Sequence, residues 1–165
     1  MFSYFYPDKW IDSVYTYDFE AARDNGYRAV LFDVDNTLVP HGAPATEEAI
    51  RLFERLRKLG FTTCLMSNNK EPRVKSFAAQ VDSPYLHKAG KPLKKGYVRA
   101  MELIGATPEN TLFIGDQLFT DVWGAKRCGI VCVLSKPIDP KEEIQIVLKR
   151  YLERIVLREY AKNIR

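Results

Sequence analysis

Short apolar runs alternate with longer amphipathic stretches along this chain of 165 residues. Five runs have the composition of buried parallel strands, which are apolar on both faces: 28–33, 61–66, 85–87, 111–114 and 130–134. The stretches between them place apolar residues near helical spacing, over 46–59, 71–80, 93–104 and 118–128. This alternation predicts an α/β fold of βαβ units with right-handed crossovers and a parallel sheet.

Local signals support the predicted helix boundaries. Thr46 stands where a helix N-cap is expected, and Gly60 ends the same helix. Pro72 falls in the first turn of the next helix, where proline is tolerated. We find no internal repeat and no low-complexity linker, so the sequence predicts a single domain over 1–165, with its core at 28–134.

The two ends of the chain differ from this core. Residues 1–27 hold nine of the twenty aromatic residues, which predicts an arm packed over the core or against the C-terminal helix. A subunit contact, and hence a homo-oligomer, and a membrane-interface contact are the alternatives. A last helix is expected over 140–163, with one apolar stripe facing the core: Ile144, Val147, Leu148, Tyr151, Leu152 and Ile155. Other apolar residues of this helix suggest a second contact surface: Ile146, Val156 and Leu157.

Composition narrows the class of protein. Hydrophobic residues make up 46% and charged residues 28% of the chain, as in soluble globular proteins. No apolar run approaches the roughly 20 residues of a membrane span, and the N-terminus lacks the pattern of a signal peptide. Three cysteines without framework spacing are expected to be reduced, buried thiols: Cys64, Cys128 and Cys132. We therefore expect a cytoplasmic protein.

The net charge of +4 is distributed unevenly. Residues 1–27 hold two basic and five acidic side chains, and residues 141–165 hold seven basic and four acidic ones. One interpretation is that the two oppositely charged ends pair with each other. The other is a basic tail for an anionic partner such as lipid headgroups or RNA.

Polar loops follow the predicted strands and carry the candidate chemistry. Asp33 and Asp35 follow the first strand, Ser67 and Asn68 the second, and Lys91 the third. The fourth strand leads into the last pair of acids, Asp116 and Asp121. The carboxyl ends of parallel strands are where ligands bind in such sheets. Oxygen-rich acids without a His or Cys cluster favour Mg²⁺, and the whole inventory matches phosphoryl transfer.

These loops resemble the four signature motifs of the haloacid dehalogenase (HAD) superfamily of phosphohydrolases. Asp33-x-Asp35-x-Thr37 resembles motif I, Ser67 motif II, Lys91-Pro92 motif III and Gly115-Asp116-x4-Asp121 motif IV. The wording Phe-Asp-Val-Asp-Asn-Thr-Leu-Val-Pro is similar to the subclass IIIA branch called YqeG-like, which is similar to mitochondrial phosphatidylglycerophosphate phosphatases. The resemblance implies a Rossmann-like three-layer core with a parallel sheet in the order 5-4-1-2-3.

The resemblance also implies a role for each motif residue. Asp33 would be the nucleophile that forms an aspartyl-phosphate, and Asp35 the general acid and then base. Mg²⁺ would be held by Asp33, the backbone carbonyl of Asp35 and Asp116, with Asp121 in direct contact or one layer behind.

Ser67, the backbone amide of Asn68 and Lys91 would bind the phosphoryl oxygens, and Thr37 would support the motif I turn. The Lys-Pro pairing favours Lys91 over other nearby lysines: Lys88, Lys94 and Lys95. His41 is interpreted as a loop residue, with the entrance of the site as the alternative.

The gaps between motifs leave no room for a cap domain. Thirty-one residues separate Asp35 from Ser67, and twenty-three separate Ser67 from Lys91. An open site suits a large or surface-presented phosphate, so phosphatidylglycerophosphate or a similar lipid phosphate is the leading substrate. Peripheral attachment at the inner face of the membrane is the associated hypothesis. A soluble sugar or nucleotide phosphatase is one alternative. The other is a non-catalytic phosphate- or RNA-binding scaffold, although an intact acid set makes a nucleic-acid partner unlikely.

Overall fold

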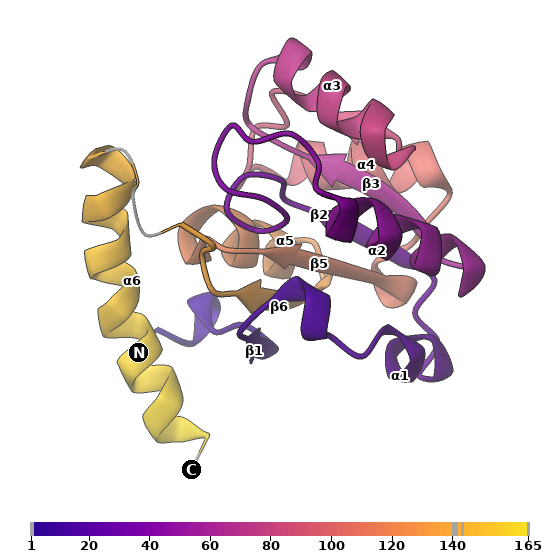
Figure 1. Ribbon diagram of the computed structural model, residues 1–165. Helices are drawn as coiled ribbons and strands as arrows, with labels where there is room; N and C mark the ends of the chain where they lie inside the picture. Colours follow the sequence, from indigo (N-terminus) through magenta and orange to yellow (C-terminus); the bar gives the residue numbers. More distant parts are fainter. Residues whose placement is uncertain (1, 140–141, 143, 165) are drawn as a thin grey trace.

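The computed structural model describes residues 2–139, 142 and 144–164. Six parallel strands form one sheet in the order β1-β6-β5-β2-β3-β4 (Figure 1). The five predicted strands therefore lie in the expected order, with a sixth added at one edge. The strands are β1 (Lys9–Ile11), β2 (Ala29–Phe32), β3 (Thr62–Met66), β4 (Tyr85–Leu86), β5 (Thr111–Gly115) and β6 (Val131–Ser135).

The sixth strand, β1, corrects the prediction that residues 1–27 form only an arm. Its Lys9 lies opposite Val133 and its Ile11 opposite Ser135 of β6. Just before it, the Asp8 amide donates to the carbonyl of Cys132 at 2.9 Å, and the Asp8 carboxylate accepts from the Cys132 amide at 2.8 Å. Three residues with one buried side chain are too short to give a strand periodicity, so the sequence pattern missed this strand.

Helices cover both faces of the sheet and give the expected three layers. Alternate residues of β2 divide between two cores: Val30 and Phe32 pack with the first, and Leu31 packs with the second. The first core includes side chains of α1, α2 and α3, and the second includes side chains of α4 and α5. The helices are α1 (Phe19–Asp24), α2 (Glu47–Lys58), α3 (Glu71–Val81), α4 (Lys94–Ile104), α5 (Trp123–Arg127) and α6 (Ile144–Asn163), with short 3-10 turns η1 (Ser3–Phe5), η2 (Val14–Thr16) and η3 (Pro108–Asn110).

Two helix starts show how local sequence sets the boundaries. The Thr46 hydroxyl accepts a hydrogen bond from the Ala49 amide at 3.1 Å, as predicted for the N-cap of α2. The helix predicted over 118–128 begins instead with a π-helical turn, η4 (Leu118–Val122), before α5. Such turns often occur at functional sites, and this one contains Asp121.

The N-terminal arm packs on the core and on α6, which confirms the expected packing. The ring centroid of Phe5 lies 5.0 Å from that of Phe119, in an edge-on arrangement. The ring of Tyr6 lies 5.3 Å from that of Tyr160, and its hydroxyl donates to the carboxylate of Glu159 at 2.9 Å. The arm therefore bridges the sheet domain and the last helix.

The prediction that the apolar stripe of α6 faces the core is wrong. Four of its members are about half exposed or more: Val147, Leu148, Tyr151 and Leu152. Ile155 is also exposed, while Val156 and Glu153 are buried, because α6 docks through charged side chains and the second apolar surface. The predicted start at Pro140 and the side chain of Ile144 lie outside the described residues.

Other expectations about the fold are met within the described part of the chain. No extra domain is inserted between β2 and α2, and only α3 and β4 lie between β3 and α4. No helix is long and apolar enough to cross a membrane. Cys64, Cys128 and Cys132 are free thiols. Cys64 and Cys132 are buried as expected, whereas Cys128 is only half-buried.

Candidate active site

The predicted motif residues converge where the central strands end. Asp33 directly follows β2, and its amide donates to the carbonyl of Ile114 in β5 at 3.0 Å. Because β2 lies between β3 and β5, the residues after those strands, Ser67 and Asp116, flank Asp33 on either side. The motifs are therefore brought together at one edge of the sheet, as ligand sites in this architecture are.

Three buried acids form the centre of this site. Asp33, Asp116 and Asp121 can each offer one carboxylate oxygen within 4.8 Å of the others, and none is more than 7% exposed. Burial is the main cause of a raised pKa for all three carboxyls, and repulsion between them adds to it. The pKa of Asp33 rises to about 7 and that of Asp116 to about 6. Such a cluster of oxygen donors could hold a divalent cation.

Lys91 supplies a positive charge within the cluster. Its ammonium nitrogen lies 2.7 Å from Oδ1 of Asp33 and 2.8 Å from Oδ1 of Asp121. Burial disfavours the charged lysine, but the two carboxylates outweigh that effect and raise its pKa. Lys91 is therefore a buried ammonium group in contact with two of the three acids.

Thr37 links the two acids that follow β2 and β5. Its hydroxyl lies 3.2 Å from Oδ2 of Asp33 and 3.1 Å from Oδ1 of Asp116. A hydroxyl has one proton, so it donates to one of these carboxylates at a time. The structure thus places Thr37 in contact with the acid cluster, beyond the turn that it was expected to support.

Backbone amides fix Asp121 in the cluster. Its Oδ2 accepts from the amides of Asp116 at 3.1 Å and Gln117 at 3.2 Å. A Cβ atom at position 115 would stand 2.7 Å from Cβ of Asp121, so Gly115 is required for this close approach. The hydroxyl of Tyr97 donates to the carbonyl of Thr120 at 2.8 Å, which holds the η4 turn that contains Asp121.

Asp35 stands apart from the three clustered acids. Its Oδ1 accepts from the Gly42 amide at 2.8 Å and from Nη2 of Arg73 at 2.9 Å, and Nδ1 of His41 lies 4.0 Å away. Burial would raise the pKa of Asp35, but these donors outweigh it and lower that pKa. The carboxylate form of Asp35 is therefore favoured. His41, which was expected to be a loop residue, lies beside this carboxylate.

The motif II loop is tied to the motif III loop. The side-chain amide of Asn68 donates to the carbonyl of Lys91 at 3.1 Å and accepts from its backbone amide at 2.9 Å. The Ser67 hydroxyl is buried and accepts from the Asn69 amide at 3.1 Å. The side chain of Asn68 is thus engaged in positioning Lys91, which leaves its backbone amide as the group predicted to meet phosphate.

Comparison with known proteins assigns this fold and site to a family. A family model for a haloacid dehalogenase-like hydrolase matches residues 44–129, about half of the chain. The "Probable phosphatase YqeG" of Bacillus subtilis is 33% identical over 155 residues, which cover 93% of this chain and 90% of that protein. The chain belongs to the haloacid dehalogenase-like hydrolases. It is a phosphatase of the HAD type.

More distant similarities support the same placement. The phosphatidylglycerophosphate phosphatase 1 of Arabidopsis thaliana is 28% identical over 159 residues, which cover 88% of this chain and 45% of that protein. The magnesium-bound crystal structure of the HAD hydrolase YfnB from Bacillus subtilis superimposes with a TM-score of 0.54 and 15% identity, over 72% of this chain and 91% of that one. At that identity the likeness concerns the fold alone.

The family match bears on the acid cluster. HAD phosphatases use a divalent metal, and the buried Asp33, Asp116 and Asp121 could hold it. The matched range contains the loops with Ser67, Lys91 and Asp116, whereas Asp33 and Asp35 precede it. The assignment of the motif I acids in this HAD phosphatase therefore depends on the geometry described above.

Two arginines of this HAD phosphatase were missed by the sequence patterns. Arg73, near the start of α3, contacts Asp35, and its guanidinium carbon lies 5.6 Å from the ring centroid of Phe77. Its Nε is buried without a hydrogen-bond partner among the described residues. An arginine in the first turns of an amphipathic helix is ordinarily a surface residue, so the sequence carried no signal for this contact.

The second missed arginine, Arg150, connects α6 to the motif IV loop. Its guanidinium contacts both the backbone carbonyl and the carboxylate of Asp116. It also lies 2.8 Å from Oε1 of Glu142 and 3.0 Å from Oε2 of Glu153, whose other oxygen accepts from the Leu118 amide at 2.9 Å. The i, i+3 spacing of Arg150 and Glu153 was the available signal, but the apolar stripe beside it dominated the pattern.

Proposed function

We propose that this HAD phosphatase is a Mg²⁺-dependent phosphomonoester hydrolase that acts through an aspartyl-phosphate. The observation that carries the proposal is the buried acid cluster with Lys91 at the ends of β2 and β5. Phosphoryl transfer depends mainly on positioning and on neutralising negative charge. A buried ammonium group among three carboxylates is suited to that task.

Asp33 is the proposed nucleophile. One of its carboxylate oxygens forms a bond to phosphorus in line with the leaving alcohol oxygen, while the bond from phosphorus to that oxygen breaks. The Thr37 hydroxyl and the Lys91 ammonium contact different oxygens of Asp33, so they orient the carboxylate. In the second half of the reaction water attacks phosphorus, the bond from phosphorus to the Asp33 oxygen breaks, and inorganic phosphate leaves the regenerated carboxylate.

Asp35 is the proposed general acid and base. It gives a proton to the leaving oxygen in the first half-reaction and accepts a proton from water in the second. Its contacts with Arg73 and the Gly42 amide favour the carboxylate form, which suits the second role. For the first role, the arriving phosphate must raise its pKa, because a neighbouring anion favours the neutral acid.

The phosphoryl oxygens are proposed to contact Ser67, the backbone amide of Asn68 and Lys91. All three lie on the loops after β3 and β4, and the Asn68 side chain ties those loops together. Burial of Ser67 and Lys91 keeps their polar groups in a low-dielectric environment, where charge-assisted hydrogen bonds are strong.

The residues fit a magnesium ion. The donors are all oxygens, and burial together with repulsion between Asp33, Asp116 and Asp121 disfavours their charged forms, which a cation would stabilise. Asp33, the Asp35 carbonyl and Asp116 would hold the ion, and Asp121 would contact it or orient the loop beside it. When bound, the ion permits a carboxylate to approach an anionic phosphate.

The proposed substrate is phosphatidylglycerophosphate or a similar lipid phosphate. Similarity to the Arabidopsis phosphatidylglycerophosphate phosphatase supports it, as does a core without an inserted cap. The chain spans less than half the length of that relative. Soluble sugar or nucleotide phosphates form the enzymatic alternative.

Hydrolysis of an aryl phosphate with Mg²⁺ tests the reaction. Wild type should turn over, and Asp33→Asn should lose activity by at least about a thousandfold, since it lacks the nucleophile. Asp24→Asn is the matched control, because Asp24 is the last residue of α1 and its side chain is 70% exposed. Equal activity in wild type and Asp33→Asn would reject this role. No activity in wild type would favour a non-catalytic phosphate-binding scaffold.

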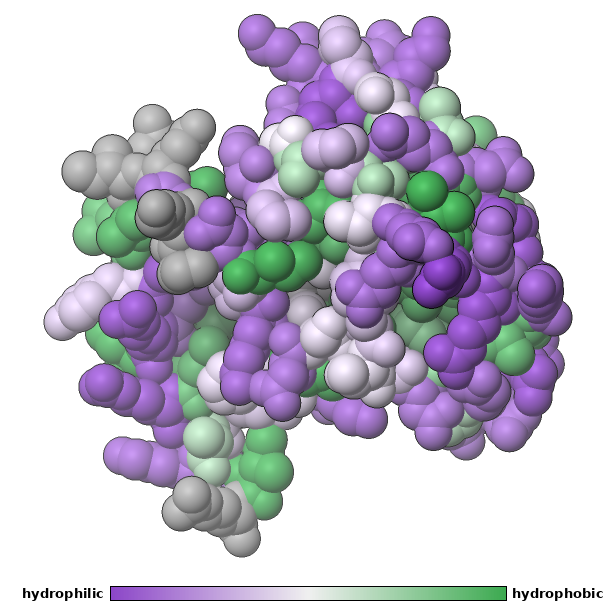
Figure 2. Space-filling model, in the orientation of Figure 1, coloured by the Kyte–Doolittle hydropathy of each residue, from purple (hydrophilic) through white to green (hydrophobic). Residues whose placement is uncertain are grey.

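A specific observation favours peripheral membrane attachment as a second proposal. Leu148, Leu152 and Ile155 of α6 are exposed. Figure 2 shows green, hydrophobic surface over this helix. Basic residues accompany them on the same helix: Lys149, Arg154, Arg158 and Lys162. Apolar and basic residues together suit an anionic bilayer surface. Flotation with anionic vesicles at low salt should carry the protein upward, and absence of binding there would reject attachment.

A further inference from the structure

A cavity of about 450 Å³ lies between α6 and the β1–β6 edge of the sheet. Asp116 lines this cavity and also belongs to the acid cluster, so the two sites share a wall. The volume is within the range of small-molecule sites. None of the predicted phosphate-binding residues lines it, so it is a separate space that opens beside the reaction centre.

The walls of the cavity are largely apolar. Leu134 of β6 and Leu157 of α6 lie on it, together with side chains that are well exposed for their size: Trp10 of β1, and Val147 and Tyr151 of α6. Trp10 is 39% exposed and Val147 50% exposed. Apolar surface that faces water in a hollow is stabilised when an apolar ligand covers it.

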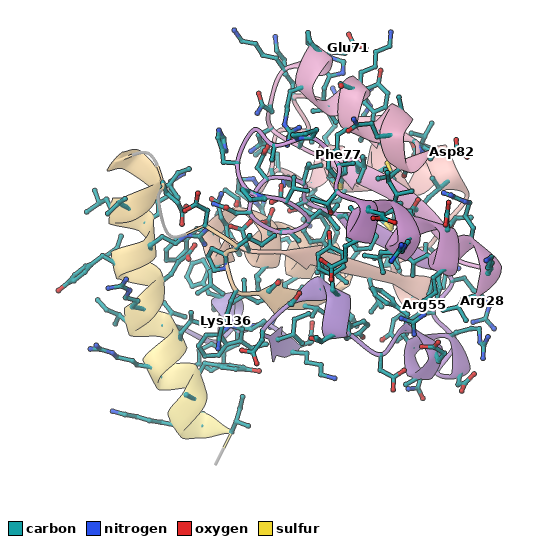
Figure 3. All side chains as sticks on the ribbon, in the orientation of Figure 1. Arg28, Arg55, Glu71, Phe77, Asp82 and Lys136 are labelled. Carbon is teal, nitrogen blue, oxygen red and sulfur yellow. The ribbon has the colours of Figure 1, made fainter. Side chains whose placement is uncertain are left out.

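Basic side chains also line the cavity, next to the apolar ones. Lys136 and Arg154 both line the cavity, and Figure 3 labels Lys136 between α6 and β1. The Lys136 ammonium lies 5.9 Å from the ring centroid of Trp10. Arg154 is exposed and has no ion pair with any residue in the described part of the chain. The acids that line the cavity, Asp116, Glu142 and Glu153, pair with Arg150, and Lys136 pairs with Asp12. An apolar hollow with Arg154 at its edge complements an anionic amphiphile.

We infer that this cavity binds the alkyl or acyl chain of an amphiphilic phosphate monoester whose phosphate lies at the acid cluster. The inference rests on the proposed function and places the apolar part of the substrate against α6. Asp116 belongs to both parts of the substrate site, and the ion pair of Arg150 with Asp116 fixes α6 as one wall of the cavity.

Binding can be measured without turnover. Trp10 and Trp123 are the two tryptophans of the chain, so Trp123→Phe leaves Trp10 as the reporter, and Asp33→Asn in the same protein suppresses hydrolysis. We expect 8-bromooctyl phosphate, kept below its micelle concentration, to quench Trp10 fluorescence saturably, because bromine quenches indole on contact. Octyl phosphate should compete with it. Absence of saturable quenching would overturn the inference.

A matched pair of variants tests the location. Val147→Glu places a charge on the cavity wall, whereas Val98→Glu makes the same change at an exposed position of α4 outside the cavity. Val147→Glu should raise the midpoint of quenching at least tenfold, and Val98→Glu should leave it within twofold of the reporter protein. Equal effects of the two variants would contradict the assignment.

A chain-length series links the cavity to turnover. From ethyl to octyl phosphate, kcat/KM of the Trp123→Phe protein with Asp33 intact should rise, by up to roughly fourfold per buried methylene. Val147→Glu should flatten the series. If aryl phosphate is hydrolysed but the series is flat, the cavity assignment fails and the proposed function stands. If quenching saturates but no phosphate is hydrolysed, the proposed function fails and the binding cavity stands.

Discussion

Two cations contact the same acidic cluster from different regions of the molecule. Lys91 comes from the loop after β4 in the core and pairs with Asp33 and Asp121. Arg150 comes from α6, outside the core layers, and pairs with Asp116. Within the described residues the ion pairs of Lys91 are with the cluster acids, whereas Arg150 also pairs with Glu142, which precedes α6, and with Glu153, which accepts from the Leu118 amide of the motif IV loop.

These contacts suggest different roles for the two cations: Lys91 acts on the reacting groups, and Arg150 holds Asp116 in position. The Lys91 side chain is 4% exposed and its charge is directed at the proposed nucleophile, so it can act on the phosphoryl group. The charge of Arg150 is shared among three carboxylates and a carbonyl, so its effect is to hold Asp116 and α6 in place. We therefore expect both cations to matter for stability, and Lys91 to matter more for catalysis.

Removing the divalent metal should have the largest effect, because only the two cations then oppose the acids. Activity on aryl phosphate should fall to background in chelator and return with Mg²⁺.

The folded pKa of Asp33 is about 7, against an ordinary value of 3.8, so the metal-free fold binds this proton more tightly than the unfolded chain does. This contribution to stability is complete below about pH 4 and is lost as pH rises through 7.

Thermal melting in chelator checks that sign. The Asp33 contribution makes the metal-free protein melt at a higher temperature near pH 5 than near pH 8, and Mg²⁺ should raise the melting temperature at pH 8. Asp33→Asn removes the titrating group and should reduce the pH dependence measured in chelator. A metal-free melting temperature with the same pH dependence in wild type and Asp33→Asn would contradict the raised pKa.

Lys91→Met should have the next largest effect. It should lower kcat/KM on aryl phosphate by about 10²–10³, the range for loss of one group that stabilises the transition-state charge. It should also lower the free energy of unfolding by about 3–5 kcal/mol, because it leaves buried carboxylates without their partner. Lys95→Met is the matched control, since Lys95 is exposed on α4. A loss below tenfold would remove Lys91 from the reaction.

Arg150→Met should separate stability from catalysis. We expect a loss of unfolding free energy similar to that of Lys91→Met, since a largely buried ion-pair network is broken. The loss in kcat/KM should be only about tenfold, because Asp116 stays in the cluster but is less well oriented. Urea unfolding and aryl phosphate kinetics measure the two effects. If Arg150→Met lost as much activity as Lys91→Met, the distinction drawn between the two cations would be wrong.

The comparison also shows what the sequence could predict. Lys91 lies in a loop after a strand with a recognisable Lys-Pro pair, and the apolar strand pattern places such loops at one sheet edge. Arg150 has no such signal, because its contact with Asp116 spans 34 residues and depends on how α6 docks. Local periodicity reports which helix face is apolar, but it does not report which face meets the core.

The same limit explains the other differences. Four core strands, β2, β3, β5 and β6, are largely buried runs of four or five residues, which the sequence pattern shows. The three residues of β1, by contrast, become a strand only because β6 offers an edge. The pairing of Arg73 with Asp35 spans 38 residues and leaves no local trace. The raised pKa of Asp33 follows from burial beside other acids, which the order of the strands creates. Tertiary contacts decided each of these features.

Thr37→Val should have the smallest effect. It tests what the hydroxyl proton of Thr37 contributes to Asp33 and Asp116. The Thr37 hydroxyl lies between Asp33 and Asp116, and valine keeps its shape but removes the donor. We expect kcat/KM to fall by about threefold to tenfold. Half-saturation by Mg²⁺ should shift to lower concentration, because the carboxylates then lack a competing donor. Thr37→Ser retains the hydroxyl and should restore both values. If serine and valine behaved alike, the loss would come from packing, and the cluster would depend on its cations and metal alone.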